Sequence, residues 1–212
     1  VKLLVTSREV LDLQGEWVYE VAGLSYPHAE HAGQPEAYPA VALFVQRAAH
    51  ASPGFTLGAT DLAAVAQICR LVEGTPLAIE LSATWLRTLT PAEIVREIES
   101  GLEVLSASLR DLPERHRSMQ VVFDRSWHRL TGREQQALAQ LSVFRGGFDR
   151  QAAEQVAGAS LSLLSTLVNR TLLRRVTAGR YQLHALVRQY CAAHLAAAPQ
   201  AQAMAQRRHY DF

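Results

Sequence analysis

The break at Gly74-Thr75-Pro76 constrains the fold of this 212-residue chain more than any other stretch. The apolar spacing of the preceding residues predicts a helix that runs from Asp61 to Val72, and Gly74 suits the left-handed cap that ends it. Pro76 suits the first turn of a new helix, which the mostly apolar run Leu77–Leu89 would form. One helix must therefore end and another begin within a few residues, which favours a compact helical subdomain.

Neighbouring residues extend this prediction to a four-helix bundle over residues 38–105. A helix is predicted over 40–49, and Asp61 serves as an N-cap or first-turn acid of the next. Thr90 and Glu93 have the spacing of a capping box at the start of the fourth helix. The proline- and glycine-rich stretch 27–39 predicts a loop and a domain boundary.

A second helical region follows a predicted linker at 106–117. Thr131 and Glu134 fit another capping box, and Gly179 suits the turn of a β-hairpin. Helices followed by a small hairpin are typical of a winged helix, here predicted over 118–198, with residues 199–212 beginning a further helical region. The predicted elements are helices at about 118–130, 133–143, 149–157 and 160–170, strands at 172–176 and 180–184, and a helix from 186 to about 198.

Residues 1–26 have a different character. Val1–Thr6 is an apolar, β-branched run that predicts a strand buried on both faces, and Glu16–Val21 alternates as a further strand would. Such strands predict the C-terminal remnant of a parallel α/β domain, in which ligands bind at the carboxyl ends of strands. The fold class expected is therefore mainly α, with this α/β edge, the helical bundle and the winged helix. Because the chain opens inside a strand without Met, we expect it to be a piece of a longer protein.

Composition excludes several classes of function. The net charge of +1 gives no overall field for nucleic acid or an anionic membrane, and no apolar run approaches the ~18 residues that span a bilayer. We therefore expect a cytoplasmic protein with no membrane partner. Cys69 and Cys191 are expected to be buried, reduced thiols, although the sequence leaves a disulfide between them open. No catalytic residue and no metal ligand is predicted.

Three short motifs together resemble one family. Thr6-Ser7-Arg8, Gly74-Thr75-Pro76 and Leu183-His184 occur in the order and approximate spacing found in STAND or NB-ARC signalling ATPases. The resemblance covers essentially the whole chain and is strongest to bacterial multidomain regulators of the LuxR/MalT-like or tetratricopeptide-repeat-linked kind. It implies an upstream P-loop core, downstream helical repeats and a homo-oligomer on activation. ADP or ATP would be the cofactor, with Mg²⁺ supplied through the missing N-terminal part.

The resemblance also implies which residues bind the nucleotide. Arg8 would sense the terminal phosphate, since a guanidinium matches phosphate oxygens. Gly74 and Pro76 would lie at the nucleotide, with Pro76 packing against the adenine, and His184 would contact the β-phosphate of ADP. The sequence departs from the family pattern at Ala185, where an Asp is usual. Whatever that acid contributes to holding the histidine, and through it the ADP-bound closed state, is therefore absent here. For each position a purely structural role, as an exposed arginine or a helix cap, stays open.

The function expected first is an ADP/ATP-controlled signalling or transcription-regulatory switch. The fragment lacks Walker A and B motifs, so it is expected to be inactive alone. The alternative is a winged-helix DNA-binding transcriptional regulator. Against it stands Leu161–Arg170, the candidate recognition helix, which carries a single basic residue, so DNA binding by this segment is not expected. Only the wing arginines compensate, namely Arg174, Arg175 and Arg180.

Overall fold

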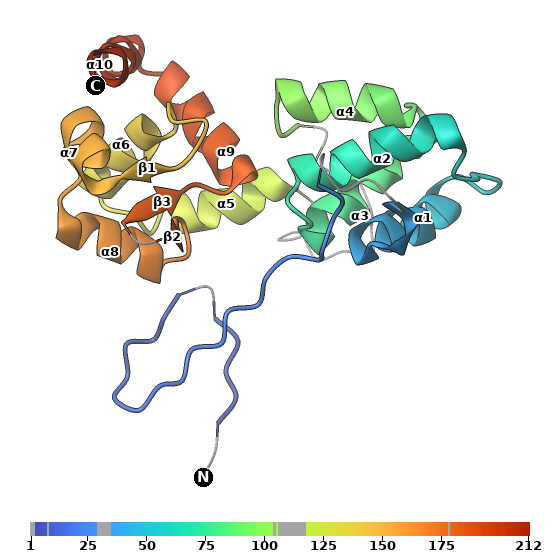
Figure 1. Ribbon diagram of the computed structural model, residues 1–212, viewed down its shortest axis with the longest axis horizontal. Helices are drawn as coiled ribbons and strands as arrows, with labels where there is room; N and C mark the ends of the chain where they lie inside the picture. Colours follow the sequence, from blue (N-terminus) through green and yellow to red (C-terminus); the bar gives the residue numbers. More distant parts are fainter. Residues whose placement is uncertain (1–2, 8, 29–34, 104, 106–117, 178) are drawn as a thin grey trace. The chain divides into compact units, whose positions relative to one another are not determined.

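The computed structural model describes residues 3–7, 9–28, 35–103, 105, 118–177 and 179–212 (Figure 1). These residues are mainly helical and include one small antiparallel sheet of three strands. They form two compact units, one of residues 22–129 and one that combines residues 1–21 with residues 130–212. The predicted linker at 106–117 lies outside the described residues, as does part of the predicted loop at 27–39.

The unit of residues 22–129 contains the predicted helical bundle. Helix α1 packs on α3, and α2 packs on α4. The predicted helix 77–89 ends early, because its last turn tightens into the 3₁₀ helix η2. Fully buried apolar side chains form the core, namely Phe44, Ile68, Ile79, Leu81, Ile94 and Ile98. The elements are η1 (Pro35–Ala37), α1 (Pro39–Ala51), α2 (Ala59–Leu71), α3 (Pro76–Thr84), η2 (Trp85–Arg87), α4 (Pro91–Ser100) and α5 (Met119–Trp127).

Capping residues and a first-turn acid stabilise the starts of three helices at the predicted positions. In the first capping box, the Thr90 and Glu93 side chains each accept from the other residue's backbone N–H. Thr131 and Glu134 form the same arrangement at the start of α6 (Gly132–Leu141). Asp61 lies in the first turn of α2, where its negative charge meets the positive end of the helix dipole. The capping-box predictions and the first-turn role of Asp61 are confirmed.

The second unit contains the predicted hairpin and the helices around it. Strand β3 lies between β1 and β2 in the antiparallel sheet, and Phe148 pairs with Tyr181. Strand β1, which has two residues, is absent from the sequence-based prediction. Buried leucines on three helices form the core, namely Leu138, Leu141, Leu164, Leu167, Leu186 and Leu195. Besides α6, the elements are β1 (Phe148–Asp149), α7 (Arg150–Ala157), α8 (Leu161–Asn169), β2 (Arg174–Thr177), β3 (Arg180–Gln182), α9 (Ala185–Ala196) and α10 (Pro199–Asp211).

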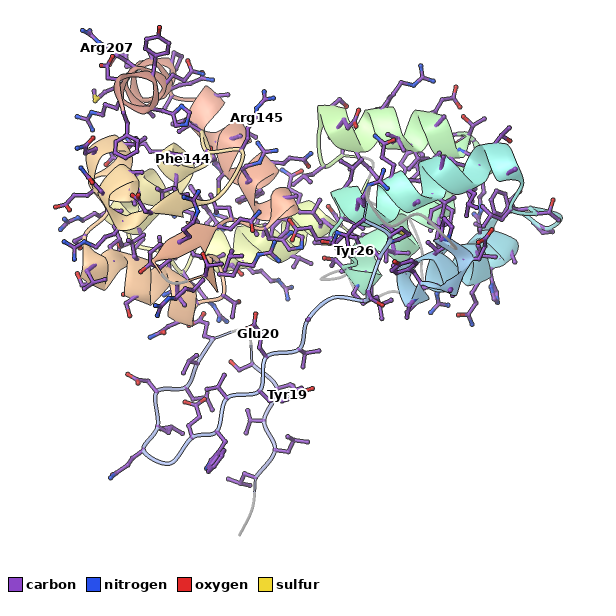
Figure 2. All side chains as sticks on the ribbon, viewed as in Figure 1. Tyr19, Glu20, Tyr26, Phe144, Arg145 and Arg207 are labelled. Carbon is purple, nitrogen blue, oxygen red and sulfur yellow. The ribbon has the colours of Figure 1, made fainter. Side chains whose placement is uncertain are left out.

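The predicted strands of residues 1–26 are not formed among the described residues. Residues 3–7 and 9–28 contain neither helix nor strand, and Leu4 and Trp17 are 98% and 96% exposed. Figure 2 shows Tyr19 and Glu20 projecting from this irregular trace. A strand needs neighbours to take up its backbone hydrogen bonds, and all three described strands pair only within the sheet of residues 148–182. The predicted edge of an α/β nucleotide-binding domain is therefore not confirmed.

Candidate nucleic-acid interface

Helices α7 and α8 are joined by a three-residue turn. Gly158 ends α7 with φ of +59°, a left-handed conformation that glycine adopts without the steric cost of a Cβ. Ala159 is fully buried, so the turn is anchored in the core. Ser160 then caps α8 by accepting a hydrogen bond from the backbone N–H of Leu163, at 3.3 Å. Two helices joined by a short turn are the arrangement of a helix-turn-helix, and in the DNA-binding members of that class the second helix lies in the major groove.

The two faces of α8 differ sharply. Leu164 and Leu167 are fully buried and hold the helix on the domain core. The exposed positions carry Leu161, Ser162, Ser165 and Asn169. Because these side chains are short or of medium length and uncharged, the outer face of α8 can approach a surface closely but cannot neutralise phosphate.

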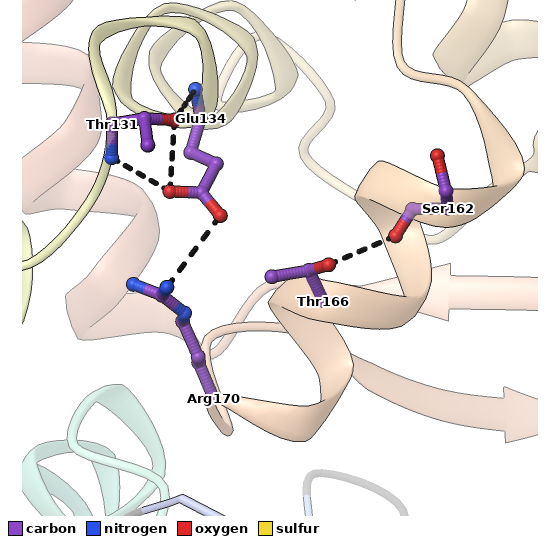
Figure 3. Close-up of polar contacts among 5 residues, drawn as sticks. All are labelled: Thr131, Glu134, Ser162, Thr166 and Arg170. Carbon is purple, nitrogen blue, oxygen red and sulfur yellow. Dashed lines mark hydrogen bonds and ion pairs between the residues drawn. The ribbon is translucent and has the colours of Figure 1, made fainter.

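An ion pair anchors the C-terminal end of α8 to the start of α6 (Figure 3). Arg170 Nη2 lies 3.7 Å from Glu134 Oε1, and both side chains are largely buried. The other carboxylate oxygen of Glu134 accepts from the backbone N–H and the hydroxyl of Thr131, at 2.6 and 3.0 Å. One carboxylate thus caps α6 and fixes the helix that would read DNA. Arg170, the basic residue at the end of α8, therefore stabilises the packing of α8 on α6 through this ion pair.

The wing consists of β2, β3 and the turn between them. Its turn includes Gly179, whose φ is +81°. All four residues of β2 are exposed, and a bulge falls between Arg175 and Thr177. Arg174 donates across the strands to Gln182 Oε1 at 3.1 Å, and Arg180 donates to the carbonyl oxygen of Gly147. The hairpin is therefore fixed by two of its own arginines, and Arg175 adds a further exposed cation.

Net positive charge is concentrated in residues 130–196, which include α7, α8 and the wing. Residues 130–196 contain eight arginines and three acidic residues, which gives +5, while the remaining residues carry thirteen basic and seventeen acidic side chains, which gives −4. Two of the three acids are used locally, since Glu134 caps α6 and Asp149 caps α7. The whole-chain charge of +1 conceals this asymmetry. Counting charge by predicted domain would have found it.

The glycine and proline predicted to bind nucleotide lie at the α2–α3 junction. The backbone N–H groups of Glu73 and Gly74 donate to the carbonyls of Arg70 and Cys69, which closes a Schellman motif. Gly74 has φ of +66°, and a Cβ there would lie 1.9 Å from the carbonyl oxygen of Leu24. Pro76 occupies the first turn of α3 and is exposed. Both residues thus have structural roles that explain the motif without a ligand.

His184 is the N-cap of α9. Its Nδ1 accepts from the backbone N–H of Leu186 at 3.2 Å, and its side chain is half-buried. Arg8 lies outside the described residues. Gly74 and Pro76 belong to one unit and His184 to the other. The structure therefore brings Gly74 and Pro76 together, while their convergence with Arg8 and His184 on one nucleotide stays a prediction.

The other reactive or metal-binding side chains in the described part of the chain do not form a second site. Burial raises the pKa of the Cys69 thiol to about 12 and also raises that of Cys191, so both thiols stay protonated. Both cysteines are free, which confirms the predicted reduced state. Among the described residues no group of three metal-binding side chains gathers. None of the described helices is both long and apolar enough to cross a lipid bilayer.

Comparison with known proteins agrees with this geometry. A family model described as a winged helix-turn-helix domain matches residues 130–196. A Mycobacterium bovis protein named "Putative HTH-type transcriptional regulator Mb0914c" is 33% identical over 98% of this chain, and a similarly named Mycobacterium tuberculosis H37Rv protein matches equally. An uncharacterized M. bovis protein is 32% identical over 73% of this chain and 37% of its own length. The chain spans only 24% of the length of the first two relatives.

These findings correct the function expected first. The winged helix-turn-helix match and the relatives named as HTH-type regulators favour the alternative, a transcriptional regulator. The prediction of an ADP/ATP-controlled switch of the STAND or NB-ARC type is therefore wrong, and nothing found supports its ATP-binding character. The reason is physical as well, because Gly74, Pro76 and His184 are each explained by capping or close packing. The winged helix and the role in transcription regulation are supported.

Proposed function

We propose that residues 130–196 bind duplex DNA as the winged helix-turn-helix module of a longer transcriptional regulator. The observation that carries the proposal is the combination of α7, its three-residue turn, α8 and the wing with a local charge of +5. This reverses the expectation that the segment does not bind DNA. That expectation weighed the single basic residue of α8 against the three wing arginines, whereas the segment of residues 130–196 as a whole carries +5.

The division of side chains suits a winged helix on DNA. An uncharged α8 with serines on its outer face can enter the major groove, where its N-terminal residues meet base edges. Phosphate contacts would come from the wing, where Arg175 is exposed. Arg150, exposed in the first turn of α7, is placed where the first helix of such a motif crosses the DNA backbone.

Regulation of transcription by the whole protein is a proposal that rests on the relatives. Their names describe HTH-type transcriptional regulators, and this chain aligns with about a quarter of their length. Within that quarter, residues 130–196 are the part that has the helix-turn-helix geometry. The simplest role for the segment is therefore to contribute DNA contacts to such a regulator.

The test is equilibrium binding of the 212-residue chain to short duplexes of random sequence, followed by fluorescence anisotropy. We expect binding that weakens steeply between roughly 50 mM and 200 mM salt, because arginines displace ions condensed on phosphate. Arg175→Gln should reduce the slope of log affinity against log salt by about 0.9, the value for one phosphate contact. Arg96→Gln on α4 removes an exposed arginine outside the domain and is the matched control. Absence of salt-dependent binding would contradict the proposal.

A further inference from the structure

Two of the four polar side chains of α8, Ser162 and Thr166, form hydrogen bonds within the helix or to its N-cap. The hydroxyls of Ser160 and Ser162 lie 2.9 Å apart and hydrogen-bond each other, while Ser160 also caps the helix. Thr166 Oγ1 donates to the carbonyl oxygen of Ser162 at 3.0 Å. These groups have less capacity left for hydrogen bonds to base edges. Base contacts through Ser160, Ser162 and Thr166 would therefore compete with these local hydrogen bonds.

Leu161 is the apolar residue among the exposed positions of α8. It is the first residue of α8 and is 56% exposed, although leucine favours burial. The two other leucines that hold this helix on the core, Leu164 and Leu167, are fully buried, so the exposure does not come from a loose helix. The first turn of the second helix in a helix-turn-helix is the part that approaches the bases. An apolar side chain is thus presented where base contacts are made.

We infer that Leu161 contacts thymine methyl groups in the major groove and that the domain prefers DNA carrying a C5-methyl at that position. The inference rests on the proposed DNA-binding function. The thymine methyl is the apolar group that the major-groove edges of the four standard bases offer, so it is the partner that matches a leucine there. Affinity then comes from wing arginines through phosphate, and base preference comes from Leu161 through apolar contact.

The experiment compares duplexes that differ only in the C5-methyl. The probes are an alternating A·T duplex and the same duplex with deoxyuridine for thymidine, which keeps every base-pairing group. A second pair is an alternating G·C duplex with cytosine or with 5-methylcytosine. We expect the methylated member of each pair to bind about fourfold more tightly per contacted methyl, the ratio that corresponds to ~0.8 kcal/mol for one buried CH₂.

Two variants assign the preference to a residue. Leu161→Ala should bring the ratio within each pair to about one while the salt slope stays unchanged, because the phosphate contacts remain. Val121→Ala on α5 removes an exposed apolar side chain outside the winged helix and should keep the wild-type ratio. Thermal unfolding of both variants checks that each remains folded.

The outcomes separate this inference from the proposed function. No salt-dependent binding to any duplex would overturn both. Binding to all four duplexes without a methyl preference, or a preference that survives Leu161→Ala, would overturn the inference and leave DNA binding in place. Light scattering gives the mass of the free protein. A wild-type dimer that Leu161→Ala converts to a monomer would mean that a second copy covers Leu161, which also overturns the inference.

Discussion

At the residue scale, Gly74 shows how a short motif can have a structural origin. Its φ of +66° is one that only glycine adopts without strain, and the carbonyl oxygen of Leu24 occupies the space of a Cβ. The backbone N–H of Leu24 also donates to the carbonyl oxygen of Gly74 at 2.9 Å. Any side chain at position 74 would have to displace this neighbouring backbone.

We therefore expect Gly74→Ala to destabilise the chain by about 2 kcal/mol or more, the combined effect of strained backbone and steric overlap. Urea unfolding followed by circular dichroism measures the change. Gly54→Ala is the control for a positive φ alone, because nothing lies within 4 Å of a Cβ there. Equal losses in the two variants would show that the close approach of Leu24 contributes nothing.

His184 is a second residue whose motif has a local explanation. Its Nδ1 caps α9 through the backbone N–H of Leu186. Replacement by Ala should cost about 1 kcal/mol, the usual value of an N-cap, whereas His184→Ser should restore most of it because serine is a good cap. Thermal unfolding of both variants measures the two losses of stability. If serine were as damaging as alanine, the cap would not be the main role of this side chain.

At the element scale, the position of α8 depends on one carboxylate. Glu134 caps α6 and pairs with Arg170, and it is only 7% exposed. Glu134→Ala removes the cap and leaves a largely buried guanidinium without this partner, so we expect a loss of roughly 3 kcal/mol. Arg170→Met should cost less, because the capping box remains. A double-mutant cycle by urea unfolding measures the coupling, and a value near zero would rule out the ion pair as an anchor.

The capping box at the start of α4 should make the stability of the fold depend on pH. The backbone N–H and the hydroxyl of Thr90 donate to the Glu93 carboxylate and lower its pKa. A carboxyl whose pKa is lower in the folded state stabilises the fold above its unfolded pKa of about 4.3, and this contribution is lost as pH falls through the folded value. Glu93→Gln should therefore be less stable than wild type at neutral pH and equally stable in acid. A difference independent of pH would contradict this.

The elements that the sequence predicts are those determined by nearby residues. Both capping boxes and the proline at the start of α3 follow from contacts within a few residues, so their patterns are visible in the chain. Strand β1 is different, because Phe148 is in a strand only through pairing with Tyr181. Residues 3–6, the described part of the predicted strand Val1–Thr6, show the converse. Their strand-like pattern has no paired neighbour among the described residues, and they form no strand.

At the scale of the whole molecule, the candidate interface could not be predicted from overall properties. Arginines of the wing and the uncharged face of α8 come from separate segments, and their joint meaning depends on the fold that places them in one domain. The net charge of +1 for the whole chain conceals opposite charges on its two parts. Residues 130–212 carry ten basic and four acidic side chains, or +6, and residues 1–129 carry eleven and sixteen, or −5.

This charge partition makes a prediction about a fragment of residues 130–212. Helices α6, α7, α9 and α10 contact one another within this part of the chain, so we expect it to unfold cooperatively by itself. At low salt it should bind duplex DNA more tightly than the full chain, because the acidic residues 1–129 no longer repel phosphate. Salt shortens the range of that repulsion to about 10 Å at 0.1 M, so the advantage should shrink as salt rises. Fluorescence anisotropy of both proteins over a salt series measures this. Weaker binding by the fragment at every salt concentration would mean that residues 1–129 contribute DNA contacts of their own.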